Sequence, residues 1–292
     1  MPRYARLPVD LGPVGVWWSG SWRAPEGASA EVAAEMEALG YGALWCSGGF
    51  EPGLASRFQR LLAATTHLVV ASGIVSIWAG GVDAVARDFE QLDARHPGRF
   101  LLGLGASHAA FVEDYRRPYS KMVAYLDDLD ATGAVPRERR ALAALGPRML
   151  RLAAERAAGA HPYFVPVEHT ARARRLLGRE ALLAPEVTVV LERDPARARE
   201  QARRFTTGYL GLPNYADNLR SLGFTEEDVR GGGSDRLVDA VVAWGDPDAV
   251  VARVKAHHEA GADHVCVQVV APDTTSFPLA QYRALAPALL AR

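Results

Sequence analysis

The chain has 292 residues, of which 49% are hydrophobic and 23% charged, a composition typical of a globular protein with a large core. Its 33 basic and 34 acidic residues give a formal net charge of −1, which excludes the strongly basic character of proteins that bind nucleic acid or anionic membranes. The N-terminus lacks the apolar stretch of a signal peptide, and no apolar run approaches a membrane span, so we expect a cytoplasmic protein. Cys46 and Cys266 lie in apolar runs and are expected to be reduced, buried thiols.

Short apolar runs alternate with amphipathic segments along the whole chain, which predicts alternating strands and helices. Strands are predicted, in chain order, at 14–17, 42–46, 68–78, 100–105, 140–146, 161–165, 187–192 and 263–270. Helices are predicted between them, at 29–39, 53–64, 82–95, 118–131, 147–158 and 168–177, with a mostly helical stretch at 195–260 and a final helix from 279. Ser29 is the expected N-cap of the first helix, and His257 and His258 are expected on a solvated helix surface.

Eight strands in such alternation predict an α/β fold, a closed (β/α)₈ TIM barrel with a helical insertion before the last strand. The competing fold is an open, doubly wound sheet. We expect one domain over residues 1–292, with the insertion at about 205–245. The glycine-rich turn at 231–235 lies inside this insertion, which is expected to form a lid or part of an oligomer surface.

In a barrel, functional residues lie at the carboxyl ends of the strands. A metal-dependent hydrolase would place a His-x-His pair after the first strand, where this chain has Trp17 and Trp18, and no cysteine or histidine spacing predicts a metal. A Schiff-base aldolase needs a lysine on an inner strand, and Lys121 and Lys255 are not on strands. The predicted rim is instead rich in glycine, serine and aromatic residues, which favours a flat aromatic cofactor.

Three segments at this rim carry candidate ligand contacts. Gly73, in SGIVSIW, marks a bulge or a close backbone approach, or only relieves crowding. In LGLGASHA, Gly105 lets the backbone pass under a ligand, and Ser107 and His108 offer hydrogen bonds; the alternative is a histidine that only caps its loop. In AALGPRML, Gly146 precedes a proline at the first helical position, so the free amides of Arg148 and Met149 are suited to phosphate, unless this is an ordinary strand-to-helix turn.

Together, these segments resemble the luciferase-like monooxygenase superfamily, and within it the coenzyme F420-dependent oxidoreductases of actinobacteria. The resemblance runs nearly end to end and is carried, in order, by GVWWSG, EALGYGALWCSG, ASGIVSIWA, GRFLLGLGASHA, RRPYSKMVAYLDDL, LAALGPRML, AAGAHPYFVPVEHT, YLGLPNYADNLRSLGF, LVDAVVAWGDPDAVVARV and AGADHVCVQVV.

The resemblance implies a binding site for a phosphorylated, three-ring cofactor, which is F420 or, alternatively, FMN. A cis peptide near Gly73–Ile74 would press on one face of the ring, flanked by Ser107 and His108. The cofactor phosphate would lie at the turn that the family uses for it. The residues implied for this turn and for the cradle of the cofactor tail are Gly146, Arg148, Met149, His161 and Tyr163.

One departure from the family concerns proton transfer. Related sugar-phosphate dehydrogenases carry an Asp-His pair after the second strand, where this chain has Gly48 and Gly49. His108 and Trp18 are the candidate catalytic replacements, and Trp18, Trp78 and Phe50 are the candidate lining of a substrate slot, although these aromatics suit a core equally well.

Three functions follow as hypotheses. The first is hydride transfer between F420 and a small organic substrate, the second is an FMN-dependent monooxygenase that uses reduced flavin and O₂, and the third is a barrel that binds a flavin or deazaflavin without turnover. No metal, nucleic-acid or membrane partner is expected, and a homodimer is, since dimers are common in the family.

Overall fold

The computed structural model describes residues 9–21, 26–48, 53–273 and 276–291. Its strands are β1 Val14–Trp18, β2 Ala43–Cys46, β3 Val69–Ser72, β4 Val75–Ser76, β5 Phe100–Gly105, β6 Arg140–Leu142, β7 Gly159–Ala160, β8 Leu182–Leu183, β9 Glu186–Val190, β10 Val242–Trp244 and β11 Val265–Val269. Its α-helices are α1 Glu26–Leu39, α2 Leu54–Ala63, α3 Val82–Arg95, α4 Pro118–Thr132, α5 Pro147–Arg156, α6 Val167–Leu177, α7 Pro195–Leu210, α8 Pro213–Arg220, α9 Asp235–Val241, α10 Pro247–Glu259 and α11 Leu279–Leu289.

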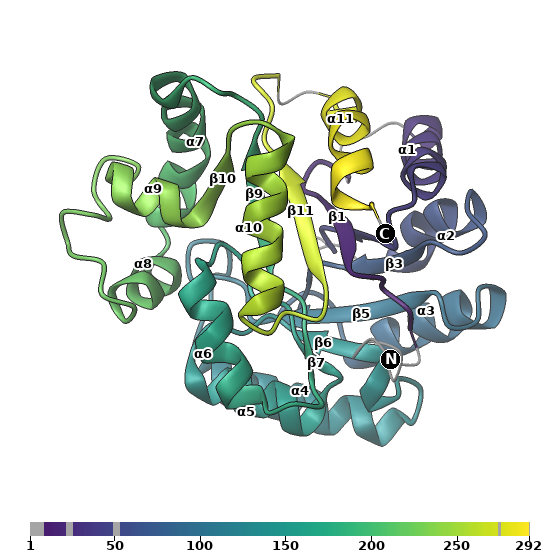
Figure 1. The fold of residues 1–292 in the computed structure, drawn as a ribbon. Helices are drawn as coiled ribbons and strands as arrows, with labels where there is room; N and C mark the ends of the chain where they lie inside the picture. The colour runs from purple at the N-terminus through teal and green to yellow at the C-terminus, as the bar shows by residue number, and fades with distance from the viewer. Residues whose placement is uncertain (1–8, 22–25, 49–52, 274–275, 292) are drawn as a thin grey trace.

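The strands pair in parallel in the order β10-β9-β11-β1-β2-β3-β5-β6-β7-β8, and β4 pairs with β5 (Figure 1). Backbone hydrogen bonds continue past the end of this path: Ala184 N–H donates to Ala160 O at 2.9 Å, and Glu186 N–H donates to Pro162 O at 2.9 Å. The chain from β8 into β9 therefore pairs with β7 on one side and with β11 on the other, so the strands follow a ring. The predicted α/β fold with parallel strands is confirmed, and the open doubly wound sheet is not what forms.

The structure corrects several predicted boundaries. The third strand is broken into β3 and β4 by a cis peptide at Gly73–Ile74, and the sixth strand ends at Ala160, so His161 follows it rather than starting it. Ser29 lies inside α1 and is not its N-cap. His257 is buried, not solvated, and its Nδ1 lies 2.9 Å from Thr170 Oγ1 on α6. A buried polar contact of this kind between distant segments has no local signature in the sequence.

The core lies on both sides of the strand ring. Val16 and Trp18 of β1 pack outward in the main cluster with the helices, whereas Trp17 joins a smaller cluster inside the ring. This alternation is the period of two that every strand imposes on its side chains. Cys46 and Cys266 are both free and buried, as predicted, and burial raises the pKa of the Cys46 thiol to about 12.

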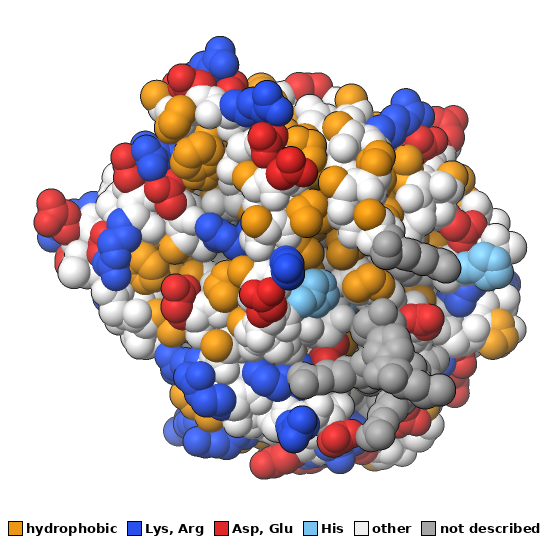
Figure 2. Space-filling model, viewed as in Figure 1, with side chains coloured by type: hydrophobic (Ala, Val, Ile, Leu, Met, Phe, Trp, Pro, Cys, Tyr) orange, Lys and Arg blue, Asp and Glu red, His pale blue; other side chains and the backbone are white. Residues whose placement is uncertain are grey.

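Between β9 and β11 the chain forms α7, α8, α9, β10 and α10, and α7 to α9 stand at one side of the barrel (Figure 1). A third apolar cluster holds this region against the barrel end and includes Phe164, Tyr215 and Leu237. No helix among the described residues is long and apolar enough to cross a membrane. Figure 2 shows acidic and basic side chains interspersed on one face of the molecule, in keeping with its near-zero net charge.

Candidate functional site

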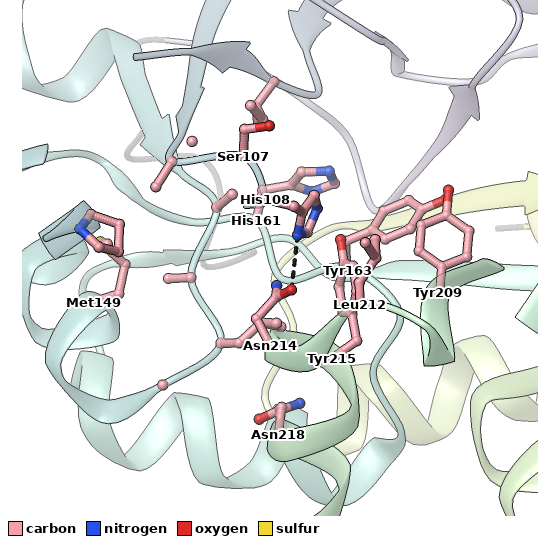
Figure 3. A pocket seen from close by; sticks show the side chains of 18 of the residues that line it. Ser107, His108, Met149, His161, Tyr163, Tyr209, Leu212, Asn214, Tyr215 and Asn218 are labelled. Atoms are coloured by element: carbon pink, nitrogen blue, oxygen red, sulfur yellow. Dashed lines mark hydrogen bonds between the residues drawn. The ribbon is translucent and has the colours of Figure 1, made fainter. Parts of the chain in front are cut away.

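A cavity of about 790 Å³ opens at the carboxyl ends of the barrel strands. The ends of β4, β5 and β6 contribute to it on one side, and α7 and α8 on another (Figure 3). Parallel α/β barrels place their ligands at this edge, and the volume is typical of a pocket for a cofactor-sized molecule. Of the residues that the sequence singled out, the cavity is lined by Gly73, Ile74, Gly105, Ser107, His108, Gly146, Met149, His161 and Tyr163.

The floor of the cavity is made of small residues packed around Ile74. A Cβ added to Gly105 would lie 2.6 Å from Ile74 Cγ1, so Ile74 keeps its place only because position 105 is glycine. Ser72 Oγ donates to Gly103 O at 3.0 Å and accepts from Gly103 N–H at 2.8 Å, which ties the end of β3 to β5. This floor of small residues and Ile74 is therefore fixed by packing.

Gly48, directly after β2, stands where related dehydrogenases carry the first residue of their Asp-His pair. A Cβ at Gly48 would lie 2.6 Å from Ile74 O and 2.7 Å from Val75 N. These are backbone atoms, which cannot move aside as the end of a flexible side chain can, so this floor has no room for an aspartate. Gly49 and Phe50 lie outside the described residues.

His161 closes the inner end of the cavity. Its Nδ1–H donates to Ala184 O at 2.7 Å, its Nε2 accepts from Trp17 Nε1 at 3.2 Å, and its ring stacks on Trp45 at 4.2 Å between centroids. Burial lowers the pKa of His161 to about 4, so the ring is neutral at physiological pH. It offers a ligand a neutral aromatic surface rather than a positive charge.

Tyrosine side chains form the wall next to His161. Tyr163 donates its hydroxyl to Gln268 Oε1 at 2.7 Å and lies 2.8 Å from the hydroxyl of Tyr209, which therefore donates to it. The ring of Tyr215 lies 5.4 Å from that of Tyr209. Burial raises the pKa of Tyr209 to about 12, so this phenol stays protonated at neutral pH.

His108 lies at the mouth, on the loop after β5. Its Nδ1 is 2.8 Å from Asn214 Oδ1 on α8, so Nδ1–H donates and Nε2 is left as an acceptor (Figure 3). Burial lowers the pKa of His108, although the hydrogen bond to Asn214 opposes this. The preceding Ser107 has a φ of 57°, and Phe111, which is 59% exposed, also borders the opening. The imidazole is thus neutral near pH 7 and held in one orientation.

The start of α5 borders the cavity at Gly146, Pro147 and Met149. Gly146 is the N-cap and provides no side-chain cap, and Pro147 has no N–H, so the amides of residues 148 and 149 have no partner within the helix. Helix N-termini of this kind bind anionic oxygens through their N–H groups and dipole. The turn therefore has the donors that a phosphate requires.

Comparison with known proteins relates part of this chain to a known family. Residues 129–264 match the family model of the luciferase-like monooxygenases, so the chain is similar to that family over this segment. No curated protein sequence matches the chain.

Solved structures share the fold of this chain over nearly its full length. An F420-dependent secondary alcohol dehydrogenase in complex with an F420-acetone adduct has a TM-score of 0.73 at 14% identity, covering 95% of this chain and 98% of that one. The coenzyme F420-dependent tetrahydromethanopterin reductase from Methanopyrus kandleri has a TM-score of 0.68 at 14% identity, covering 94% and 97%.

A flavin enzyme shares the fold of this chain as well. The oxygenating constituent of 3,6-diketocamphane monooxygenase from the CAM plasmid of Pseudomonas putida, in complex with FMN, has a TM-score of 0.61 at 16% identity, covering 94% and 96%. Identities this low establish that the fold is shared.

Two predicted site residues, Trp18 and Arg148, do not border the cavity. Trp18 points away from it and packs on Phe277 at 5.0 Å, while Trp17 lines the cavity instead. A shift of one residue on a strand moves a side chain to the opposite face. The guanidinium of Arg148 lies 4.0 Å from the ring centroid of Tyr119, and Arg148 is not among the cavity-lining residues. Trp78, predicted to line a substrate slot, does not line the cavity either; its Nε1 donates to the backbone oxygen of Ala106, which does.

The sequence reasoning missed the helical wall of the cavity. This wall is formed from α7 and α8 by Gly208, Tyr209, Leu212, Asn214, Tyr215, Asp217, Asn218 and Ser221, with Arg172 from α6. Asn214, Asn218 and Ser221 are spaced as one face of a helix, a signal that the segment YLGLPNYADNLRS contains. The sequence of the segment does not indicate that this helix face lies toward the mouth of the barrel. Among the described residues, no group of three metal-ligating side chains exists.

Proposed function

We propose that this protein is an oxidoreductase that transfers a hydride between the deazaflavin coenzyme F420 and a small organic substrate. The observation that carries the proposal is that one cavity of about 790 Å³ combines a floor of small residues around Ile74 with uncapped helix amides. An aromatic ring can lie against such a floor, and the amides can bind a phosphate.

The residues of the cavity fit such a cofactor. Ile74 and Gly105 would lie against the ring, with His161 as a neutral aromatic neighbour, and the amides at Gly146 to Met149 would hold the phosphate. When bound, the coenzyme supplies two-electron redox chemistry, because deazaflavin has carbon in place of the flavin N5. The protein's own contribution is to position the substrate, exclude water and move a proton.

His108 is the side chain suited to move that proton. It is neutral near pH 7, its Nδ1–H is committed to Asn214, and its Nε2 is free to accept. In the oxidative direction Nε2 accepts the proton of a substrate hydroxyl group, and in the reductive direction it returns the proton to the carbonyl oxygen. This role requires no Asp-His pair after β2, for which Gly48 leaves no room.

We also infer that residues 205–245 are an insertion relative to a plain barrel. The support is their position between β9 and β11, and the cavity-lining side chains of Tyr209, Asn214 and Asn218 that they contribute. We expect that deletion of this segment would remove one wall of the cavity, and not only exposed surface residues.

An FMN-dependent monooxygenase and a non-catalytic binder are the competing functions, and a spectroscopic titration distinguishes them. We expect micromolar binding of F420, no binding of FMN, and loss of F420 absorbance when the loaded protein meets its substrate in a panel of alcohols. In the reductive direction, protein loaded with reduced F420 is tested against the corresponding carbonyl compounds and against enones and imines, and the absorbance of oxidised F420 should return. Binding of FMN alone, with O₂ uptake by the reduced form, contradicts the proposal and supports the monooxygenase. Binding of F420 with no turnover on any substrate supports the binder.

A further inference from the structure

One face of α8 forms a polar row along the cavity wall. Asn214, Asn218 and Ser221 lie four and three residues apart, so they share one side of the helix, and all three line the cavity (Figure 3). The two outer members have partners: Asn214 binds His108, and Ser221 Oγ accepts from Arg172 at 2.8 Å. The middle member, Asn218, has a side-chain nitrogen for which the described residues provide no hydrogen-bond acceptor.

The amide of Asn218 is buried without a partner. The residue is 7% exposed, and its Nδ2 has no acceptor among the described residues. Buried amide groups in proteins are almost always hydrogen-bonded, because desolvation without a partner is costly. Rotation about the bond between Cβ and Cγ exchanges Nδ2 and Oδ1, so this side chain can turn a donor toward a group in the cavity.

Arg172, on α6, adds a positive charge at the same end of the cavity. Among the described residues it has no carboxylate partner within 4.0 Å, whereas Arg174, on the same helix, lies 2.5 Å from Asp263. The one acidic side chain in the cavity lining, Asp217, is paired with Arg220 at 2.8 Å. The charge of Arg172 is therefore not neutralised by the protein.

The end of the cavity that holds these groups also contains the start of α5. His169, one turn before Arg172 on α6, donates from Nε2 to Leu145 O at 2.9 Å. Leu145 directly precedes the Gly146 turn, so α5, α6 and α8 converge at this end. An uncompensated cation, a free amide donor and uncapped backbone amides together have the chemistry of an anion site.

We propose that Asn218 and Arg172 bind an anionic oxygen group, phosphate or carboxylate, of the molecule that occupies the cavity. This inference rests on the proposed function, since it assigns the group to the cofactor or to the substrate of that site. Arg172 provides the positive charge and directional N–H donors, and Asn218 donates a hydrogen bond. Ser221 holds the guanidinium in place. The group belongs either to the phosphate and tail of the cofactor or to an acidic substrate.

The test uses fluorescence titration of the full-length protein with two ligands: F420, and the deazaflavin nucleoside that has the same ring without phosphate and tail. The variants are Asn218→Ala and Arg172→Gln. The control is Arg175→Gln, an exposed arginine of α6 outside the cavity lining. Isothermal titration of inorganic phosphate into the F420-loaded protein provides the second arm. Binding of the nucleoside serves as the check that each variant is folded.

If the anionic group is the cofactor's, Arg172→Gln weakens F420 binding about 10-fold or more and Asn218→Ala weakens it less, while nucleoside binding and the control stay unchanged. If the group is the substrate's, neither variant changes F420 binding, but both abolish the binding of inorganic phosphate to the loaded protein. Variants that match the control in all titrations overturn the inference. Failure of wild-type protein to bind either cofactor form overturns the proposed function instead, and inorganic phosphate titrated into the free protein then tests the anion site alone.

Discussion

His108 and Asn214 lie 106 residues apart in the chain, yet their contact decides what the imidazole can do. A lone histidine on a loop carries no assigned role, because its tautomer and charge depend on its neighbours. The bond to Asn214 fixes the proton on Nδ1, and burial keeps the ring neutral by lowering the pKa of His108. A single side chain thus becomes a directed proton acceptor.

The prediction at this scale concerns His108→Ala. We expect the turnover number to fall about 10²- to 10⁴-fold, since a positioned general base contributes that much, with little change in F420 affinity. The pKa of His108 lies below the ordinary 6.5, so the oxidative rate should rise with pH through that lower value and be flat above it. The pH-rate profile of wild type and variant checks this, with the exposed His67→Ala as control. An acid limb that persists in His108→Ala would assign the titration to another group.

At the scale of the element, the broken third strand depends on its neighbours across the ring. Ile74 reaches the cavity floor because Gly105 at the end of β5 has no side chain there, and Gly48 at the end of β2 leaves room for the Ile74 carbonyl. Strands β2, β4 and β5 therefore form one packed unit under the cavity. A change in any of them moves the floor.

Gly105→Ala tests this packing. The added methyl would lie 2.6 Å from Ile74 Cγ1 and 3.2 Å from Ala143 Cβ, so we expect the Ile74 side chain to be pushed into the cavity. Overpacking of this kind costs about 1–3 kcal/mol of unfolding free energy and should weaken cofactor binding as well. Urea unfolding and cofactor titration measure the two effects. Gly81→Ala is the matched control, because a methyl there meets nothing within 4 Å; equal behaviour of the two variants would contradict the packing argument.

At the scale of the whole molecule, buried histidines determine the response to acid. Burial lowers the pKa of His161 and His169 to about 4 and that of His257 and His264 to about 3. Since each folded pKa is below the ordinary 6.5, the unfolded chain binds more protons as the pH falls below about 6.5. Each histidine then removes up to about 1.4 kcal/mol of stability per pH unit.

Glu186 acts in the opposite direction. Burial raises the pKa of its carboxyl to about 7, so its contribution is present in acid and is lost as the pH rises from its ordinary 4.5 toward 7. Because four histidines oppose one glutamate, we expect the free energy of unfolding to fall by at least about 1 kcal/mol per pH unit between pH 6.5 and 5. Urea unfolding across this range checks the sign. His257→Gln should reduce the slope, and stability that rises on acidification would contradict the argument.

The sequence by itself determined the alternation of strands and helices, the parallel α/β class and the edge of the barrel at which the cavity lies. These follow from local periodicity and turn chemistry, which neighbouring residues encode. It also singled out Gly73, Gly105 and the Gly146 turn as candidate ligand contacts. Glycine allows close backbone approach, and a Gly-Pro step marks the start of a helix, so both can be recognised from the local sequence.

Only the tertiary structure decided which of Trp17 and Trp18 faces the cavity, that Arg148 turns outward, and that the α8 face completes the wall. Each depends on the register of a strand or the placement of a helix, which is fixed by packing between segments far apart in the chain. For the same reason, the partner of His108 and the lone amide of Asn218 emerged only when α8 was placed against the barrel mouth. The local sequence pattern determines where helices and strands form, and the packing of these helices and strands determines which side chains come into contact in the cavity.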